Sequence, residues 1–278
     1  MVSQEQRRRQ LAREKFLRQQ TRRTDARRKA RTRNAVIASV IGVVLIGSLA
    51  LYTTDAFKSD DSANASSETT PSAAPTTPPP DPCEEPAAGE VATKTWEKEP
   101  AMSIDESATY TMTLATTCGD IDIDLKTAAA PQTVNSFAFL AGEGYFDHTN
   151  CHRLTTSGIY VLQCGDPLGD GTGGPGYTIP DENLDDTSLE GDVYPTGTVA
   201  MANQYDATTG EGRDSGGSQF FLVFQDSPLP PDYTPFGTVS ESGMAVLEKI
   251  AGAGENTGAG DGAPNATVVI NKATVTKS

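Results

Sequence analysis

The chain has 278 residues, of which 22 are Lys or Arg and 37 are Asp or Glu, giving a formal net charge of −15. Thirteen basic and three acidic residues give residues 1–33 a charge of +10, whereas nine basic and 34 acidic residues give the rest of the chain −25. This division excludes one homogeneous domain, and the acidic bulk argues against a nucleic-acid-binding main domain, which would need a cationic surface.

An apolar segment without charge occupies residues 35–52. As a helix rising about 1.5 Å per residue, it spans about 27 Å, close to the ~30 Å hydrocarbon core of a bilayer. We interpret it as a transmembrane anchor that is not removed. The alternative is a cleavable signal peptide, with Ser48-Leu49-Ala50 as its cleavage site.

Basic residues precede this segment and form an arm at residues 1–34, whereas only Lys58 follows it closely. By the positive-inside rule, the arm is predicted to be cytoplasmic and the chain after Tyr52 extracytoplasmic. The arm serves either as a topology signal alone or also as a contact to anionic lipid head groups. The expected location is the cell membrane, in a single-pass arrangement with the lipid bilayer contacted through residues 35–52.

Residues 53–94 are predicted to form a disordered linker, because they are rich in Ser, Thr, Ala and Pro and lack aromatic residues after Phe57. Such a stretch buries too little apolar surface to offset the entropy of ordering. The folded domain is predicted to cover residues 95–278, beginning near Thr95 and Trp96.

The folded domain opens with a predicted hairpin, since residues 109–114 and 120–125 alternate with a period of two and flank a turn at 117–119. A short helix that starts at Pro131 and is ended by glycines follows. The apolar spacing of Met244, Leu247 and Ile250 predicts a second helix, and residues 266–270 begin a closing strand. Many short strands with two helices indicate a mainly β fold, a closed antiparallel barrel capped by helices.

Several short motifs occur in a fixed order within this domain. They are Cys151-His152-Arg153 with Gln163-Cys164-Gly165-Asp166, then Gly171-Thr172-Gly173-Gly174, Met201-Ala202-Asn203, Gly217-Ser218-Gln219-Phe220-Phe221 and Phe236-Gly237. Over about residues 108–278 their order resembles the cyclophilin family of peptidyl-prolyl cis-trans isomerases. The resemblance implies a closed eight-stranded barrel with a helix over each open end and a substrate groove on its outer wall.

The resemblance also implies residue roles where the motifs match. Arg153 corresponds to the family's catalytic arginine. The implied substrate-binding residues are Tyr160, Val161, Gln163, Ala202, Asn203, Gln219, Phe221, Leu229 and Tyr233. Phe220 is expected in the core instead, because adjacent strand residues face opposite sides.

The chain departs from the family pattern at several places. Nine residues separate Arg153 from Gln163, more than is usual, which affects the assignment of Tyr160 and Val161. Pro228 and Tyr233 stand where many members place Trp and His, and the loop at residues 204–218 is longer than usual. These departures bear on substrate preference and inhibitor sensitivity and leave Arg153 in place.

An arginine suits this reaction chemically. Rotation about an X-Pro bond crosses a barrier of ~18–20 kcal/mol because it removes amide conjugation. A guanidinium beside the prolyl nitrogen binds the twisted state more tightly than either planar isomer, and its charge is permanent. We therefore expect no nucleophile, metal or cofactor.

Four cysteines, Cys83, Cys118, Cys151 and Cys164, lie on the predicted oxidising side. They allow two disulfides in three connectivities, with Cys151–Cys164 the first choice, and free buried thiols are the alternative. His148 and His152 flank Cys151, but no further Cys or acidic pair completes a metal site.

The sequence thus predicts a monomeric, membrane-anchored isomerase that assists the folding of exported proteins, with proline-containing polypeptides as substrates. One rival is a non-catalytic module that holds proline-containing peptides in the same groove. Another is a tether in which residues 1–33 recruit nucleic acid or a cytoplasmic partner.

Overall fold

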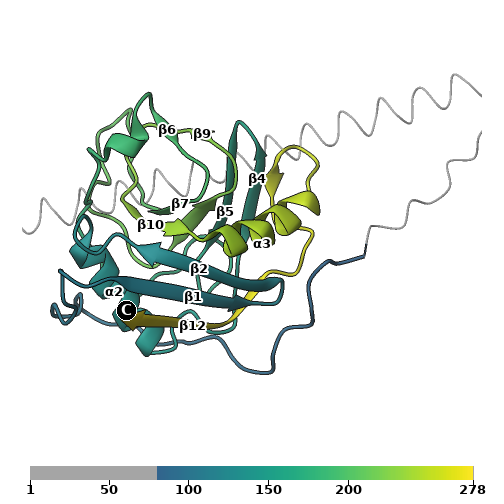
Figure 1. The fold of residues 1–278 in the computed structure, drawn as a ribbon, viewed down its shortest axis with the longest axis horizontal. Coiled ribbons are helices and arrows are strands. Elements are labelled where there is room, and N and C mark those ends of the chain that lie inside the picture. The colour runs from purple at the N-terminus through teal and green to yellow at the C-terminus, as the bar shows by residue number, and fades with distance from the viewer. Residues whose placement is uncertain (1–79, 278) are drawn as a thin grey trace, which may run out of the picture. The chain divides into compact units, whose positions relative to one another are not determined.

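The computed structural model describes residues 80–277 (Figure 1). The predicted basic arm, the predicted membrane segment and residues 53–79 of the predicted linker lie outside the described residues. None of the helices within residues 80–277 is long and apolar enough to cross a membrane. The elements in chain order are β1 (Tyr110–Thr116), β2 (Gly119–Leu125), α2 (Pro131–Gly142), β3 (Thr149–Asn150), β4 (Arg153–Ser157), β5 (Ile159–Cys164), η1 (Thr187–Leu189), β6 (Val193–Tyr194), β7 (Thr198–Met201), β8 (Phe220–Val223), β9 (Ser227–Pro228), β10 (Pro235–Val239), α3 (Glu241–Gly252), β11 (Asp261–Gly262) and β12 (Val269–Lys277).

The predicted hairpin is confirmed, and it is formed by β1 and β2. Met112 pairs with Ile123 and Leu114 with Ile121, and all four side chains are buried. The intervening positions face outward, where Thr113 Oγ1 donates to Asp122 over 2.6 Å. Alternation of apolar and polar residues therefore fixes which face of the hairpin meets the core.

The strands form one curled ten-stranded sheet in the order β11-β4-β5-β8-β7-β10-β2-β1-β12-β3, with a separate pair, β6-β9. The predicted closed eight-stranded barrel is wrong, because the sheet is a half-barrel that does not close on itself. The chain passes from β3 at one edge to β4 near the other through Cys151 and His152 alone. The outer edge of β4 pairs with β11 instead, so β3 and β4 are joined by the chain and not by a ladder.

Both predicted helices are confirmed. Pro131 occupies the first turn of α2, where the Glu182 carboxylate accepts hydrogen bonds from the backbone N–H groups of Gln132 and Thr133. The α3 helix is capped by Ser240, whose hydroxyl accepts from the backbone N–H of Gly243. α2 packs against β12 and α3 against β2, so each covers part of the curled sheet (Figure 1).

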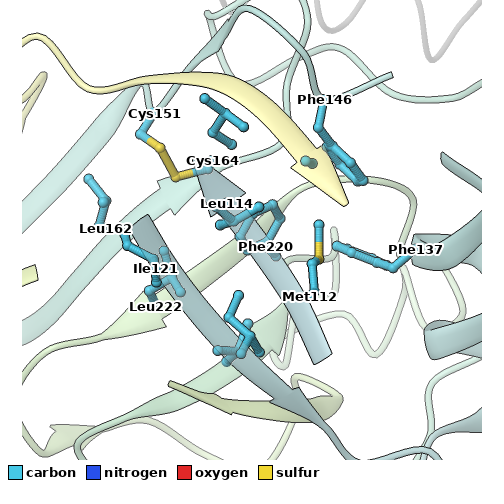
Figure 2. Close-up of a cluster of buried hydrophobic side chains, with 14 of the residues drawn as sticks. Met112, Leu114, Ile121, Phe137, Phe146, Cys151, Leu162, Cys164, Phe220 and Leu222 are labelled. Atoms are coloured by element: carbon cyan, nitrogen blue, oxygen red, sulfur yellow. A yellow bond between two sulfur atoms is a disulfide. The ribbon is translucent and has the colours of Figure 1, made fainter. Parts of the chain in front are cut away.

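Side chains on alternate positions of the central strands enter two different apolar clusters. Figure 2 shows the main core, to which β8 contributes Phe220 and Leu222 and β5 contributes Leu162. On the opposite face of the same strands, Phe221 and Val161 join a smaller cluster. The predicted core position of Phe220 is confirmed, and its neighbour faces the other way.

Residues 80–94 contact the domain, although the sequence analysis placed them in the linker. Cys83 forms a disulfide with Cys118 in the β1–β2 turn, and Asp81 accepts a hydrogen bond from the Thr267 backbone. Further along, the ring of Trp96 packs edge-on against Phe139 at a centroid distance of 5.2 Å. This segment lacks regular helix or strand, so no periodic pattern marked it in the sequence.

The second disulfide joins Cys151 and Cys164, as the first-choice pairing predicted. It lies beside Leu162 and Phe220 at the margin of the main core (Figure 2). The bond connects the residues just before β4 and at the end of β5, so it ties together the two strands that carry Arg153 and Gln163.

Candidate active site

A cavity of about 180 Å³ opens on the outer face of the sheet, over the smaller apolar cluster. Its lining residues are Arg153, Ile159, Val161, Gln163, Ala202, Asn203, Phe221, Leu229 and Tyr233. The rings of Phe221 and Tyr233 meet edge to face at a centroid distance of 5.5 Å. The cavity therefore has an apolar side, while Arg153, Gln163 and Asn203 supply polar groups.

Arg153 begins β4, and its guanidinium is held on two sides. Its Nε and Nη2 donate to the two carboxylate oxygens of Asp261, each over 2.7 Å, and Nη1 donates to Gln163 Oε1 over 3.3 Å. The hydrogen bond to Asp261 raises the pKa of Arg153, and the same bond lowers the pKa of Asp261. A guanidinium has five N–H donors. Within residues 80–277 two of the five have no partner, one on Nη1 and one on Nη2.

The amide of Gln163 is oriented by a relay of hydrogen bonds. Gln163 Nε2 donates to Gln219 Oε1 over 2.9 Å, and Gln219 Nε2 donates to the Gly173 carbonyl over 2.9 Å. Since each amide nitrogen is directed away from Arg153, the Gln163 oxygen faces the guanidinium. Gln219 lies outside the apolar cavity and lines a second one of about 520 Å³, which shares Gln163, Ala202 and Asn203 with the first.

Asn203 uses its side chain within the domain. Its Nδ2 donates to the Asp232 carbonyl over 2.7 Å, and its Oδ1 accepts from the Tyr205 backbone over 3.1 Å. The preceding residue is fixed by the hydrogen bond from Ala202 N to the Gln219 carbonyl. In the described part of the chain, the backbone N–H and carbonyl of Asn203 have no partner. Both groups are thus unpaired at a residue that lines both cavities.

Residues 111–275 match the family described as "Cyclophilin type peptidyl-prolyl cis-trans isomerase/CLD". The chain belongs to this family. The match covers the whole curled sheet except its margins, including every strand that lines the two cavities.

Several curated relatives share the cyclophilin domain. The chain is 49% identical over 173 residues to "Probable peptidyl-prolyl cis-trans isomerase B" of Mycobacterium leprae, covering 59% of this chain and 56% of that protein. It is 46% identical over 173 residues to the protein of the same name from Mycobacterium tuberculosis, covering 59% and 54%. The chain thus spans about half the length of these relatives. To "Peptidyl-prolyl cis-trans isomerase" of Helicobacter pylori it is 40% identical over 140 residues, covering 50% of this chain and 78% of that protein.

A solved structure agrees with the fold. The crystal structure of a Cryptosporidium parvum cyclophilin type peptidyl-prolyl cis-trans isomerase aligns with a TM-score of 0.50 at 24% identity, covering 61% of this chain and 99% of that one. At this identity the likeness shows the cyclophilin fold alone.

Eight of the ten residues proposed from the sequence line the apolar cavity of this cyclophilin domain. Tyr160 does not, because β5 alternates and Val161 and Gln163 occupy its outer face. The Tyr160 ring lies on the other face, 6.0 Å from the ring of Phe224. Ile159 lines the cavity in its place and was missed. Counting back from Gln163 in steps of two would have found it.

The glycine-rich connection of the cyclophilin domain closes around one buried carboxylate. Asp166 is fully buried and accepts hydrogen bonds from the backbone N–H groups of Leu168 and Gly171. A Cβ at Gly173 would lie 1.9 Å from Asp166 Oδ1, so only glycine fits there. This packing presents the Gly173 carbonyl to Gln219, and the loop serves the site as a scaffold.

The long loop at residues 204–218 is tied down at its far end. The Arg213 guanidinium lies 3.5 Å above the Tyr205 ring and pairs with Asp232 and, over 3.7 Å, with Asp181. Asp232 is the residue whose carbonyl also accepts from Asn203. This long loop therefore shares its anchor with a residue of the site.

Two further groups complete the surroundings. Tyr194 was not singled out in the sequence, and its hydroxyl donates to the Tyr233 carbonyl and accepts from the Tyr233 backbone N–H. Both ring nitrogens of His152 are buried without a hydrogen-bond partner among residues 80–277, and burial lowers the His152 pKa. No group of three His, Cys, Asp or Glu side chains within the same residues is arranged to hold a metal ion.

Proposed function

We propose that this domain accelerates cis–trans isomerisation of X-Pro bonds in polypeptides, with Arg153 as the catalytic residue. One observation carries the proposal: the Arg153 guanidinium lies at an apolar cavity, and one N–H of Nη1 and one N–H of Nη2 have no partner within residues 80–277. A cation beside an apolar seat suits a substrate whose ring is apolar and whose nitrogen gains electron density as the bond twists.

Isomerisation makes and breaks no covalent bond. Catalysis therefore requires only that the enzyme stabilise the charge distribution of the twisted amide. The amide nitrogen loses conjugation at the top of the ~18–20 kcal/mol barrier and becomes a hydrogen-bond acceptor. A donor that binds this state and not the planar amide lowers the barrier. A 10⁴-fold acceleration corresponds to ~5.4 kcal/mol of such differential binding. Arg153 supplies a permanently charged donor, and Gln163 holds it in place.

The substrate chain is placed by the remaining residues. The proline ring enters the cavity beside Val161, Phe221 and Leu229, where burial of its apolar surface favours binding. The backbone N–H and carbonyl of Asn203 pair with the peptide on one side. The chain then continues past Gln163 into the second cavity, which borders the first.

The full chain and its Arg153→Ala variant test this function in a coupled X-Pro peptide isomerisation assay. We expect kcat/KM to fall at least about tenfold, or ~1.4 kcal/mol, in the variant. Arg153→Lys keeps the positive charge but replaces the planar guanidinium by a single ammonium group, so its kcat/KM should lie between those of Arg153→Ala and the wild type. A wild type that binds the peptide without accelerating it would instead support a non-catalytic proline-peptide module.

We also propose that the domain is extracytoplasmic and monomeric, is anchored through residues 35–52, and acts on exported proteins. Two disulfides support an oxidising compartment. Exported chains present X-Pro steps that take ~10–100 s without catalysis. Mass spectrometry of the mature N-terminus tests whether the anchor is retained, and protease treatment of intact cells tests which side the domain faces. Loss of residues 1–50 from the mature protein would contradict the anchor.

A further inference from the structure

We propose that Asp261 is a positioning residue for the isomerase reaction, which directs the Arg153 guanidinium into the substrate cavity. The inference rests on the proposed function of Arg153 and adds a residue that no sequence motif marked. Asp261 lies 108 residues after Arg153 in the chain, in the two-residue strand β11.

The contact between the two side chains is bidentate. Asp261 Oδ1 accepts from Arg153 Nε and Asp261 Oδ2 accepts from Arg153 Nη2, each over 2.7 Å. Such a side-on pair fixes the plane of the guanidinium as well as its location. Asp261 thus occupies the Nε–Nη2 edge, and Gln163 accepts from Nη1. One N–H of Nη1 and one N–H of Nη2 are left for the substrate, and Asp261 fixes the plane in which they lie.

Backbone pairing sets the position of Asp261 relative to Arg153. Asp261 is the register partner of Thr155, two residues beyond Arg153 on β4. The two side chains are therefore diagonal neighbours on one face, a separation that long side chains bridge. The adjacent hydrogen bond from Thr156 N to the Gly260 carbonyl extends this pairing.

The loop that carries Asp261 is itself organised by one carboxylate. Glu255 accepts hydrogen bonds from the backbone N–H groups of Thr257 and Gly260, over 2.6 and 2.8 Å. The Asn256 backbone N–H also donates to the Ala263 carbonyl, which closes the loop at its base. These hydrogen bonds hold the turn that carries Asp261, so the position of Asp261 does not depend on its ion pair with Arg153 alone.

Because the Arg153–Asp261 pair is partly exposed, a role in positioning Arg153 can be distinguished from a role in stabilising the fold. The side chains of Arg153 and Asp261 are 40% and 54% exposed. Ion pairs that are this accessible contribute little to the free energy of unfolding, because water screens them. A substitution of Asp261 that lowers kcat but leaves the free energy of unfolding unchanged would therefore show that Asp261 positions the Arg153 guanidinium.

The test uses the full chain with Asp261→Asn, in which the carboxylate becomes a neutral amide of the same shape. Asp105→Asn is the charge-matched control, since Asp105 is the exposed partner of Lys277 in an ion pair outside the cavity lining. We expect kcat to fall about fivefold for Asp261→Asn with a smaller change in KM, and both constants to stay at wild-type values for the control. Asp261→Glu keeps the charge and should recover part of kcat.

A spectroscopic readout and a double variant complete the test. The Arg153 Nε–H signal in ¹⁵N NMR should be sharp in the wild type and broadened in Asp261→Asn, because the guanidinium regains rotation. In an Arg153→Ala background, Asp261→Asn should cause no further loss. If Arg153→Ala is slow while Asp261→Asn matches or exceeds the wild-type kcat, the positioning role is overturned and the proposed function stands. If Arg153→Ala is as fast as wild type, the proposed function itself fails.

Discussion

Arg153 and Gln163 lie directly opposite each other in the β4–β5 ladder, and Arg153 Nη1 donates to Gln163 Oε1 over 3.3 Å. The pairing is local, since a single hairpin with one tight connection brings the two residues together. The Cys151–Cys164 disulfide joins the same two strands next to this pair. Arg153 and Gln163 are therefore held in one covalently closed hairpin.

Replacement of Gln163 by Ala should lower kcat/KM by at least about fivefold, because Arg153 loses a restraint and the peptide loses a polar contact. The measurement is a coupled isomerisation assay at several peptide concentrations. Gln225→Ala is the control, since Gln225 is an exposed glutamine in the loop after β8, and its kcat/KM should equal that of the wild type. Equal loss in both variants would show that the effect is not specific to the site.

Adjacent phenylalanines on β8 should separate stability from binding. Phe221→Leu alters the wall of the cavity, so KM should rise about threefold or more with a loss of stability of about 1 kcal/mol. Phe220→Leu alters the main core, so the free energy of unfolding should fall more while KM is unchanged. Urea unfolding and steady-state kinetics on both variants check this, and a reversed pattern would contradict the alternation of β8.

Arg213→Ala should release the long loop at residues 204–218. The guanidinium stacks on Tyr205 and pairs with Asp232, so its loss should speed limited proteolysis within the loop. The change in the free energy of unfolding should stay below about 1 kcal/mol, since the pair is partly exposed. Lys94→Ala, which breaks the exposed pair with Glu143, serves as control and should leave the cleavage pattern unaltered.

Removal of the Cys83–Cys118 disulfide should destabilise the domain without altering turnover. The bond spans 35 residues, and closing such a loop restricts the unfolded chain by about 3–4 kcal/mol. We expect the Cys83→Ser, Cys118→Ser double variant to lose free energy of unfolding of this order in urea. Its kcat/KM at 25 °C should equal that of the wild type, and a large drop there would link this bond to the site.

The domain should lose stability as the pH falls below about 6.5, the usual pKa of an unfolded histidine. Burial lowers the pKa of His152 in the folded state. On acidification the His152 ring is therefore protonated at a higher pH in the unfolded chain than in the folded one, and this favours the unfolded state. His152→Gln, of similar size and without a titrating ring, should show a shallower fall in the free energy of unfolding between pH 7 and pH 5. The difference in free energy of unfolding between the two proteins at pH 8, where His152 is neutral in both states, measures the effect of the substitution on packing. If the two stability curves run parallel between pH 7 and pH 5, His152 is not the cause of the pH dependence.

Much of the fold could be predicted because local patterns controlled it. The alternation in β1 and β2 and the apolar spacing of α3 each reported a buried face. Closure of the sheet could not be predicted in this way, since it depends on whether β3 and β4 pair or whether β11 takes the free edge. In the structure the outer edge of β4 pairs with β11, a two-residue strand with no periodicity of its own.

The site shows the same division. Motifs located Arg153, Gln163 and Phe221, because these residues belong to short segments of fixed order. Ile159 was missed because two extra residues before Gln163 obscured the alignment, although strand parity alone points to it. Asp261 was out of reach, since its relation to Arg153 exists only after β11 has paired with β4.

The bond between Cys83 and Cys118 also has a mechanical consequence. The covalent link joins the chain ahead of Cys83 directly to the β1–β2 turn, so tension on that chain is passed on to this turn. In the sheet order that hairpin is separated from β7, β8 and β5 by β10. If the chain is anchored through residues 35–52 as proposed, a pull from the N-terminal side reaches the sheet at this hairpin before it reaches the strands that line the cavity.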